Sequence, residues 1–243
     1  MKKGIVYDSV WSLGQWCVTA MSLKDLGLRS ASGPFDWMGG PHELIGHYVE
    51  MIVEGFPNFF RKENMRKLRE NPKEGTEHWF DDGQGWEIRH EFKMGVPFEE
   101  NYARYRAQLD RRIERLLASL RSGGQVLLVH VRGEGRYAEG EVVGAARRIR
   151  AAFPDTKIDL LVLEPDSSAK DIVFEEPEPG VFVAVGDFYD MRRYDVVRGN
   201  KPLILSVFRR IRMRGRWRNL LRALIESLRK RLLRRGKKRR GGI

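Results

Sequence analysis

Cys17, the only cysteine of the chain, is the residue whose chemistry the sequence marks most clearly. Before Gly14 the apolar residues alternate as in a buried strand, and after Trp16 they recur every three or four residues as in a helix that ends at Gly27. Cys17 is therefore expected in the first turn of a helix, where unpaired N–H groups and the helix dipole lower a thiol pKa and favour a thiolate nucleophile. The alternative is a small buried hydrophobic residue.

Two histidines are candidates for the general base that such a thiol needs. His90 lies on the returning arm of a predicted hairpin, where its spacing from Trp86 and Phe92 predicts that it shares their apolar face. His130 lies near the end of an unbroken apolar strand, Gln125 to Val131, and is the second choice. The alternative for an inward histidine is a core residue with no part in catalysis.

A carboxylate completes the predicted site, and the sequence offers two. Asp36 lies in the proline-stiffened segment Ser32 to Trp37, and Asp187 follows a predicted strand that ends near Gly186. Either carboxylate could hold the imidazole in the required tautomer, as in a catalytic triad. The residues predicted to bind the oxyanion or the substrate are Ser12, Gly14, Gln15, Trp37, His130 and Arg132. No residues have metal-ligand spacing, so we expect neither a metal nor another cofactor.

These motifs together resemble a bacterial family of unknown function that is catalogued as papain-like cysteine peptidases. The similarity extends from about residue 5 to about residue 165. It rests on Ser12-Leu13-Gly14 with Cys17, Leu26 to Arg29, Pro34-Phe35-Asp36-Trp37, His90-Glu91-Phe92 (usually His-Asp-Phe in the family), Arg111-Arg112 with Arg115, and Val126 to Arg132. The resemblance implies a thiol hydrolase with Cys17 as nucleophile and His90 as base. In papain-like enzymes a glutamine lies several residues before the cysteine, whereas here only Trp16 separates Gln15 from Cys17.

The elements that must position these residues predict an α/β fold. The strand at 125–131, a helix at about 140–152 and a strand at 157–163 indicate a right-handed crossover in an open, mainly parallel sheet flanked by helices. We expect one domain over residues 1–208, with an inserted β-hairpin at about 76–93, and a short helix plus loop over 61–74. Papain instead packs a helical half against an antiparallel half. A parallel sheet would therefore suit an esterase or acyl transferase acting on cell-surface polysaccharide as well as a peptidase.

The net charge of +12 belongs to the end of the chain. Residues 209–240 hold sixteen Lys and Arg against Glu226 alone, which is +15 and leaves −3 for residues 1–208. Apolar residues recur there at helical spacing, so we expect a basic amphipathic C-terminal helix and a disordered tail over 209–243. Such a helix either packs on the domain through its leucines or lies on an anionic membrane. Specific nucleic-acid binding is not expected, because Trp217 is the only aromatic residue in the basic run.

The remaining features bear on location and on the class of function. The first residues lack a signal peptide, no run approaches the ~18 apolar residues of a membrane span, and one cysteine suits a reducing compartment. We therefore expect a cytoplasmic protein, with the inner membrane surface as the place to which its tail could bind. The predicted function is cysteine-dependent hydrolysis of a peptide, ester or acyl-sugar. The alternative from another class is a binding protein tethered by its basic tail to an anionic membrane or partner.

Overall fold

The structure, a computed structural model, describes residues 5–14, 17–40, 44–190, 193–194 and 198–225. Its main sheet has five strands, of which the first four are parallel and the last is antiparallel to its neighbour. In spatial order they are β1 (Ser9–Ser12), β6 (Gln125–Val131), β7 (Lys157–Pro165), β9 (Val181–Gly186) and β8 (Val173–Glu178). The predicted mainly parallel α/β sheet is confirmed.

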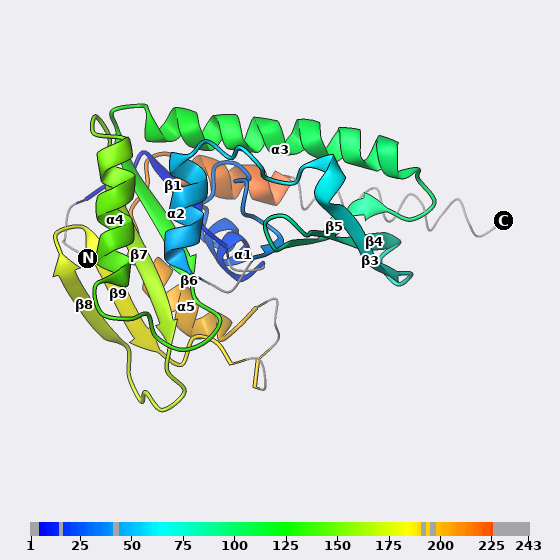
Figure 1. The fold of residues 1–243 in the computed structure, drawn as a ribbon. Helices are drawn as coiled ribbons and strands as arrows, with labels where there is room; N and C mark the ends of the chain where they lie inside the picture. The colour runs from blue at the N-terminus through cyan, green and yellow to red at the C-terminus, as the bar shows by residue number, and fades with distance from the viewer. Residues whose placement is uncertain (1–4, 15–16, 41–43, 191–192, 195–197, 226–243) are drawn as a thin grey trace.

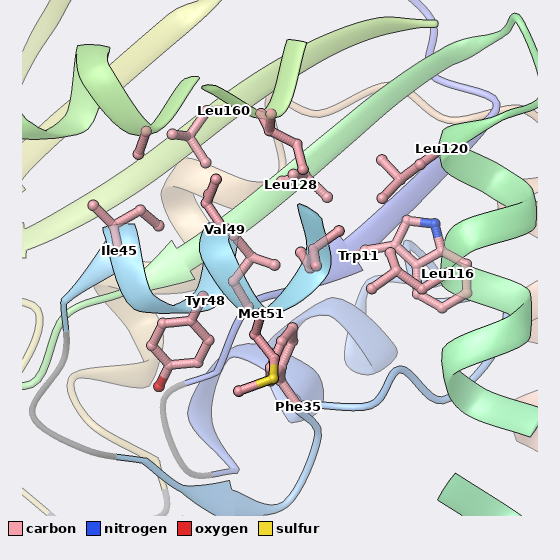
Figure 2. Packing of buried hydrophobic residues seen from close by; sticks show 14 of the residues in the cluster. Trp11, Phe35, Ile45, Tyr48, Val49, Met51, Leu116, Leu120, Leu128 and Leu160 are labelled. Atoms are coloured by element: carbon pink, nitrogen blue, oxygen red, sulfur yellow. The ribbon is translucent and has the colours of Figure 1, made fainter. Parts of the chain in front are cut away.

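Helices cover both faces of this sheet, as Figure 1 shows. One face packs against α2 (Ile45–Val53), α3 (Phe98–Leu120) and α4 (Glu141–Ala152), and the other against α1 (Val18–Asp25) and α5 (Lys201–Phe208). Successive residues of β6 enter the two cores in turn, Leu128 on the α2 side and Leu127 on the α1 side. Burial on both faces explains why the strand is apolar without alternation. Figure 2 shows the core on the α2 side of the sheet, to which α2 and α3 both contribute side chains. Leu116 and Leu120 of α3 lie beside Trp11 there.

A second, antiparallel sheet combines three strands between α2 and α3 with one short strand that precedes α2. Its strands, in spatial order, are β2 (Met38–Gly39), β5 (Trp86–Lys93), β4 (Thr76–Asp81) and β3 (Met65–Asn71), and the short 3-10 helix η1 (Lys62–Asn64) precedes β3. The predicted hairpin is present as β4 and β5. The expectation of a short helix plus loop over 61–74 is wrong beyond η1, because β3 is an edge strand with mostly exposed polar side chains and gives no alternating signal. Helix α3 runs along both sheets (Figure 1).

The chain after α5 returns to the start of the main sheet. Tyr7 N–H donates to the Arg212 carbonyl and Arg214 N–H donates to the Tyr7 carbonyl, both at 2.9 Å, and Ile211 between them and α5 is fully buried. A helix then begins at residue 216 and continues to residue 225. The predicted tail beyond it lies outside the described residues. No helix in the described ranges is long and apolar enough to cross a membrane.

Candidate functional site

Cys17 lies where the sequence predicts, at the carboxyl end of β1 and the start of a helix. β1 ends at Ser12 beside β6, and Cys17 is the N-cap residue of α1. Only 6% of its surface is exposed. Gln15, a predicted oxyanion ligand, lies outside the described residues, as does Trp16. The turn therefore brings a nearly enclosed thiol to the edge of the sheet where open α/β folds bind their ligands.

Backbone and side-chain hydrogen bonds fix the turn before Cys17. Leu13 N–H donates to the Val129 carbonyl at 2.8 Å, Gly14 N–H donates to the Ser12 hydroxyl at 3.1 Å, and the Thr19 hydroxyl donates to the Gly14 carbonyl. Gly14 has a φ of +76°, and a Cβ at this position would lie 2.9 Å from the Tyr48 hydroxyl oxygen. Any other residue would thus be strained and would clash.

His130 also holds this turn through a side-chain hydrogen bond. Its ring is fully buried, with Nδ1 3.0 Å from the Leu13 carbonyl oxygen and Nε2 3.0 Å from the Tyr137 hydroxyl. A carbonyl only accepts, so Nδ1 donates and Nε2 accepts, and the Tyr137 hydroxyl in turn accepts from Ile45 N–H at 3.0 Å. Burial lowers the pKa of His130 to about 4. His130 is thus a neutral imidazole with both nitrogens in use, which suits a positioning residue better than a base.

Arg132 joins this group at the end of β6. Its guanidinium lies 3.9 Å from the centre of the Tyr137 ring, and its Nε donates to the Glu134 carbonyl at 2.6 Å. The loop after β6 also forms one wall of a pocket of about 620 Å³ over the carboxyl ends of β6, β7 and β9. Charged and polar residues line it, among them Arg136, Asp166 and Asp190. The pocket offers room for a ligand at the carboxyl ends of the parallel strands, and Cys17 is not among the residues that line it.

Asp36 is buried in an ion pair that involves no histidine. Its Oδ2 lies 2.6 Å from Arg29 Nη2 and accepts a 2.9 Å hydrogen bond from Gly33 N–H. Burial raises the pKa of the Asp36 carboxyl above its ordinary value, and the Arg29 guanidinium opposes that rise. The neighbouring Trp37 has a φ of 71° and lies under Arg29, 5.4 Å from ring centre to guanidinium carbon. Arg29, Gly33 and Asp36 thus form a charged clamp that holds this segment.

The prediction that His90 shares a face with Trp86, Ile88 and Phe92 is wrong. Ile88 pairs with Trp79 and Phe92 pairs with Glu77, so β5 holds two more residues than β4 between these pairs. This bulge turns His90 outward, leaves its side chain 42% exposed and sets Nδ1 3.0 Å from Glu74 Oε2.

The same bulge turns Glu91 toward α3. Its Oε1 lies 2.9 Å from Nη2 of Arg112, whose side chain is buried. The motif residue that contacts the body of the protein is therefore the glutamate after His90.

Asp187, the second candidate carboxylate, also lies in an ion pair with an arginine. Asp187 accepts from Arg193 at 3.1 Å and from the Tyr194 hydroxyl at 2.5 Å. The side chains of three histidines have other partners: His78 accepts from Arg69, His90 lies beside Glu74, and His130 bonds to Leu13 and Tyr137. Ser12, Gly14 and His130 thus lie at the Cys17 turn, with Arg132 against Tyr137, whereas Asp36 and Asp187 lie in ion pairs with arginines and His90 lies beside Glu74. Within the described ranges no acidic, histidine or cysteine cluster could hold a metal ion.

Three residues of the site were not anticipated from the sequence. Tyr137 links His130 to α2, Tyr48 closes over Gly14, and Thr19 holds the Gly14 carbonyl. Tyr137 follows a glycine-rich loop and Tyr48 lies on an apolar helix face, so neither has a motif. Thr19 had a usable signal, because a hydroxyl in the first turn of a helix often bonds to a nearby backbone group.

Comparison with known proteins places this arrangement in a family. The uncharacterized protein R408 of Acanthamoeba polyphaga mimivirus is 26% identical over 131 residues, which are 49% of this chain and 59% of that protein. No solved structure matches the chain. Residues 8–156 match the family described as "Putative papain-like cysteine peptidase (DUF1796)", a range that includes Cys17, His90 and His130 and ends before Asp187. Because this match covers more than half of the 243 residues, the chain belongs to that family.

Proposed function

We propose that this protein is a cysteine-dependent hydrolase of peptide or related acyl bonds, with Cys17 as its nucleophile. The observation that carries the proposal is the fixed turn that presents Cys17 at the start of α1, at the carboxyl end of β1. Family membership supports it, since the matching range contains this turn and the family is described in terms of the same chemistry. The proposal assigns the substrate to the carboxyl-end side of the sheet, where a pocket lies over the ends of β6, β7 and β9.

The start of α1 favours the thiolate. Met21 N–H donates to the Cys17 carbonyl at 2.9 Å, so Cys17 opens the helix and the first N–H groups of α1 lie beside it. Such N–H groups and the helix dipole generally favour a negative sulfur, and the proposal gives them this role at Cys17. In the proposed reaction the sulfur attacks the substrate carbonyl, the amine or alcohol leaves, and water then hydrolyses the thioester. Backbone N–H groups of the turn would hold the oxyanion.

The proposed base is a histidine. His90 is the candidate from the family motif, and Glu74, rather than Asp36, lies beside its Nδ1 and leaves Nε2 available. His130 is the weaker candidate, because both of its nitrogens are bonded and its pKa is lowered to about 4. An esterase or acyl transferase would use the same thiolate, so substrate class is a second question.

The test is the pH dependence of Cys17 alkylation by iodoacetamide in the native protein. We expect an apparent pKa well below the ~8.5 of a free thiol, and a loss of this activation in His90→Ala. Cys17→Ser gives the background, and each other histidine is replaced in turn as a matched control. If a different histidine variant loses the activation, Cys17 stays the nucleophile and that histidine replaces His90 as the base.

Slow alkylation with an ordinary thiol pKa in the native protein would overturn the proposal. Cys17 would then be a buried structural residue, in keeping with its 6% exposure, and the protein would belong to the binding class. Where activation is found, paired peptide and ester substrates decide between the peptidase and the esterase. Loss of turnover in Cys17→Ser assigns the activity to this site.

A further inference from the structure

The helix at residues 216–225 is attached to the domain through its polar side. Arg216 Nε donates to the Leu26 carbonyl at 2.7 Å, and Asn219 Nδ2 donates to the Gly27 carbonyl at 3.1 Å. These carbonyls follow the C-terminus of α1, where backbone acceptors lack helical partners. A Cβ on Gly27 would lie 2.5 Å from Leu220 Cγ, so the two segments are in close contact. The orientation of the helix is thus fixed by specific bonds.

Its apolar side faces outward. Five large side chains at helical spacing are each between 41% and 64% exposed, namely Trp217, Leu220, Leu221, Leu224 and Ile225. Spacings of three, four, seven and eight residues place them on one stripe. Leu220 contacts Gly27, but the sequence-based alternative, a terminal helix packed on the domain through its leucines, is wrong for Leu221 and Leu224, which are 49% and 56% exposed. A soluble domain that exposes such a stripe generally uses it to bind something.

The charges around the stripe are all of one sign. Residues 209–225 contain seven arginines and neither aspartate nor glutamate. Arg218 and Arg222 are exposed beside the stripe. Arg222 also lines a pocket of about 300 Å³ with Lys24, Arg29, Ser30 and Ser32. Within the described part of the chain, neither Lys24 nor Arg222 forms an ion pair, so both can meet an anionic group.

We propose that this helix is a docking surface for a bilayer that contains anionic phospholipid. The apolar stripe enters the boundary between headgroups and acyl chains, while the arginines and the Lys24 pocket bind headgroup phosphates. A second copy of the chain is a poor occupant, because facing helices would bring the three arginines of each helix, Arg216, Arg218 and Arg222, against those of the other. Nucleic acid would use the arginines but leave the leucines in water. This inference is independent of the proposed thiol chemistry.

The test is flotation of the full chain with vesicles of phosphatidylcholine alone or mixed with phosphatidylglycerol. We expect binding only to the mixed vesicles and weaker binding at high salt. The double variant Leu221→Gln with Leu224→Gln should weaken binding about tenfold or more, because two apolar anchors are lost. Leu44→Gln with Leu68→Gln removes two exposed leucines elsewhere and should bind like the native protein.

The charge component is tested with Arg218→Gln and Arg222→Gln together, which should weaken binding roughly tenfold at low salt. Arg121→Gln with Arg198→Gln removes the same charge from other exposed positions and should have a smaller effect. Absence of binding to the mixed vesicles overturns the proposal. Binding that the leucine variant leaves unchanged also overturns it, since a purely electrostatic surface would then serve nucleic acid or an acidic partner. Circular dichroism confirms that each variant is folded.

Discussion

The turn that carries Cys17 and the segment that carries Asp36 are both held by buried hydrogen bonds, but the bonded groups differ in kind. The turn depends on neutral partners, the His130 imidazole and the hydroxyls of Ser12, Thr19 and Tyr137. The Asp36 segment depends on ions, since Asp36 pairs with Arg29. Arg112, which pairs with Glu91, also lowers the pKa of Asp36, so the two ion pairs influence each other.

The thiol and the carboxylate that a catalytic triad would bring together are therefore held by two separate networks. A neutral network holds a backbone in place without placing a fixed charge beside the thiol. An ion pair in the interior is strongly sensitive to the loss of either partner, because the remaining charge has no counterion. We infer that the ion pair of Asp36 and Arg29 maintains the fold of the segment Ser32 to Trp37. The His130 network maintains the Cys17 turn. Removing each in turn should therefore change different properties of the protein.

The largest expected effect is on stability in Asp36→Asn. Arg29 would lose its carboxylate in a site where only 10% of its side chain is exposed, so we expect unfolding to become easier by about 3 kcal/mol. Urea unfolding measures this loss. The alkylation rate of Cys17 in the folded variant should equal that of the native protein.

Arg29→Met with Asp36→Asn is the matched control for this pair. Because it removes both charges, it should be more stable than Asp36→Asn alone. A small loss of stability combined with slow Cys17 alkylation would instead make Asp36 part of the catalytic group, and the comparison would fail.

A smaller effect, and one that depends on pH, is expected at His130. Its pKa falls from 6.5 to about 4 on folding, so the unfolded chain binds the extra proton between these values. Stability is therefore highest above pH 6.5 and falls as the pH is lowered toward 4, by about 2 kcal/mol between pH 7 and pH 5 from this group. His130→Asn keeps a donor for the Leu13 carbonyl but does not titrate.

Urea unfolding at the two pH values tests this expectation. The difference in stability between pH 7 and pH 5 should shrink in His130→Asn by roughly the same 2 kcal/mol. His90→Asn, which removes an exposed histidine, controls for the loss of an imidazole as such. If the stability difference between pH 7 and pH 5 is as large in His130→Asn as in the native protein, protonation of His130 is not what destabilises the fold at low pH.

The sequence predicted the elements whose pattern follows from burial. Strand β6 is apolar throughout because both faces are covered, and the turn between β4 and β5 has the composition of a hairpin. Strand β3 gave no such signal, since its polar side chains face water. The helix at 216–225 has the predicted stripe, but periodicity does not tell which side meets the domain. Two side-chain bonds to the carbonyls of Leu26 and Gly27 decide that.

The candidate site was predictable in part for a similar reason. Cys17 follows from local spacing along one stretch of chain, whereas the partners of His90 depend on how two strands pair. Alternation assumes that each residue of β5 has one opposite it in β4, and two extra residues in β5 break that assumption. His130 was found at a strand end, but its neutral state depends on Tyr137 and Leu13, which no local pattern joins to it.

The smallest expected change in stability concerns the exposed pair of His90 and Glu74. Because stability should hardly change, these variants test directly whether His90 acts as the base. Both side chains are more than 40% exposed, so Glu74→Gln and His90→Gln should each alter stability by no more than about 0.5 kcal/mol. A fall in Cys17 alkylation in these variants would then reflect a lost base and not a damaged fold, and would make Glu74 the residue that orients it. Unchanged alkylation in both variants would assign the bulge in β5 to a single role, the presentation of Glu91 to Arg112.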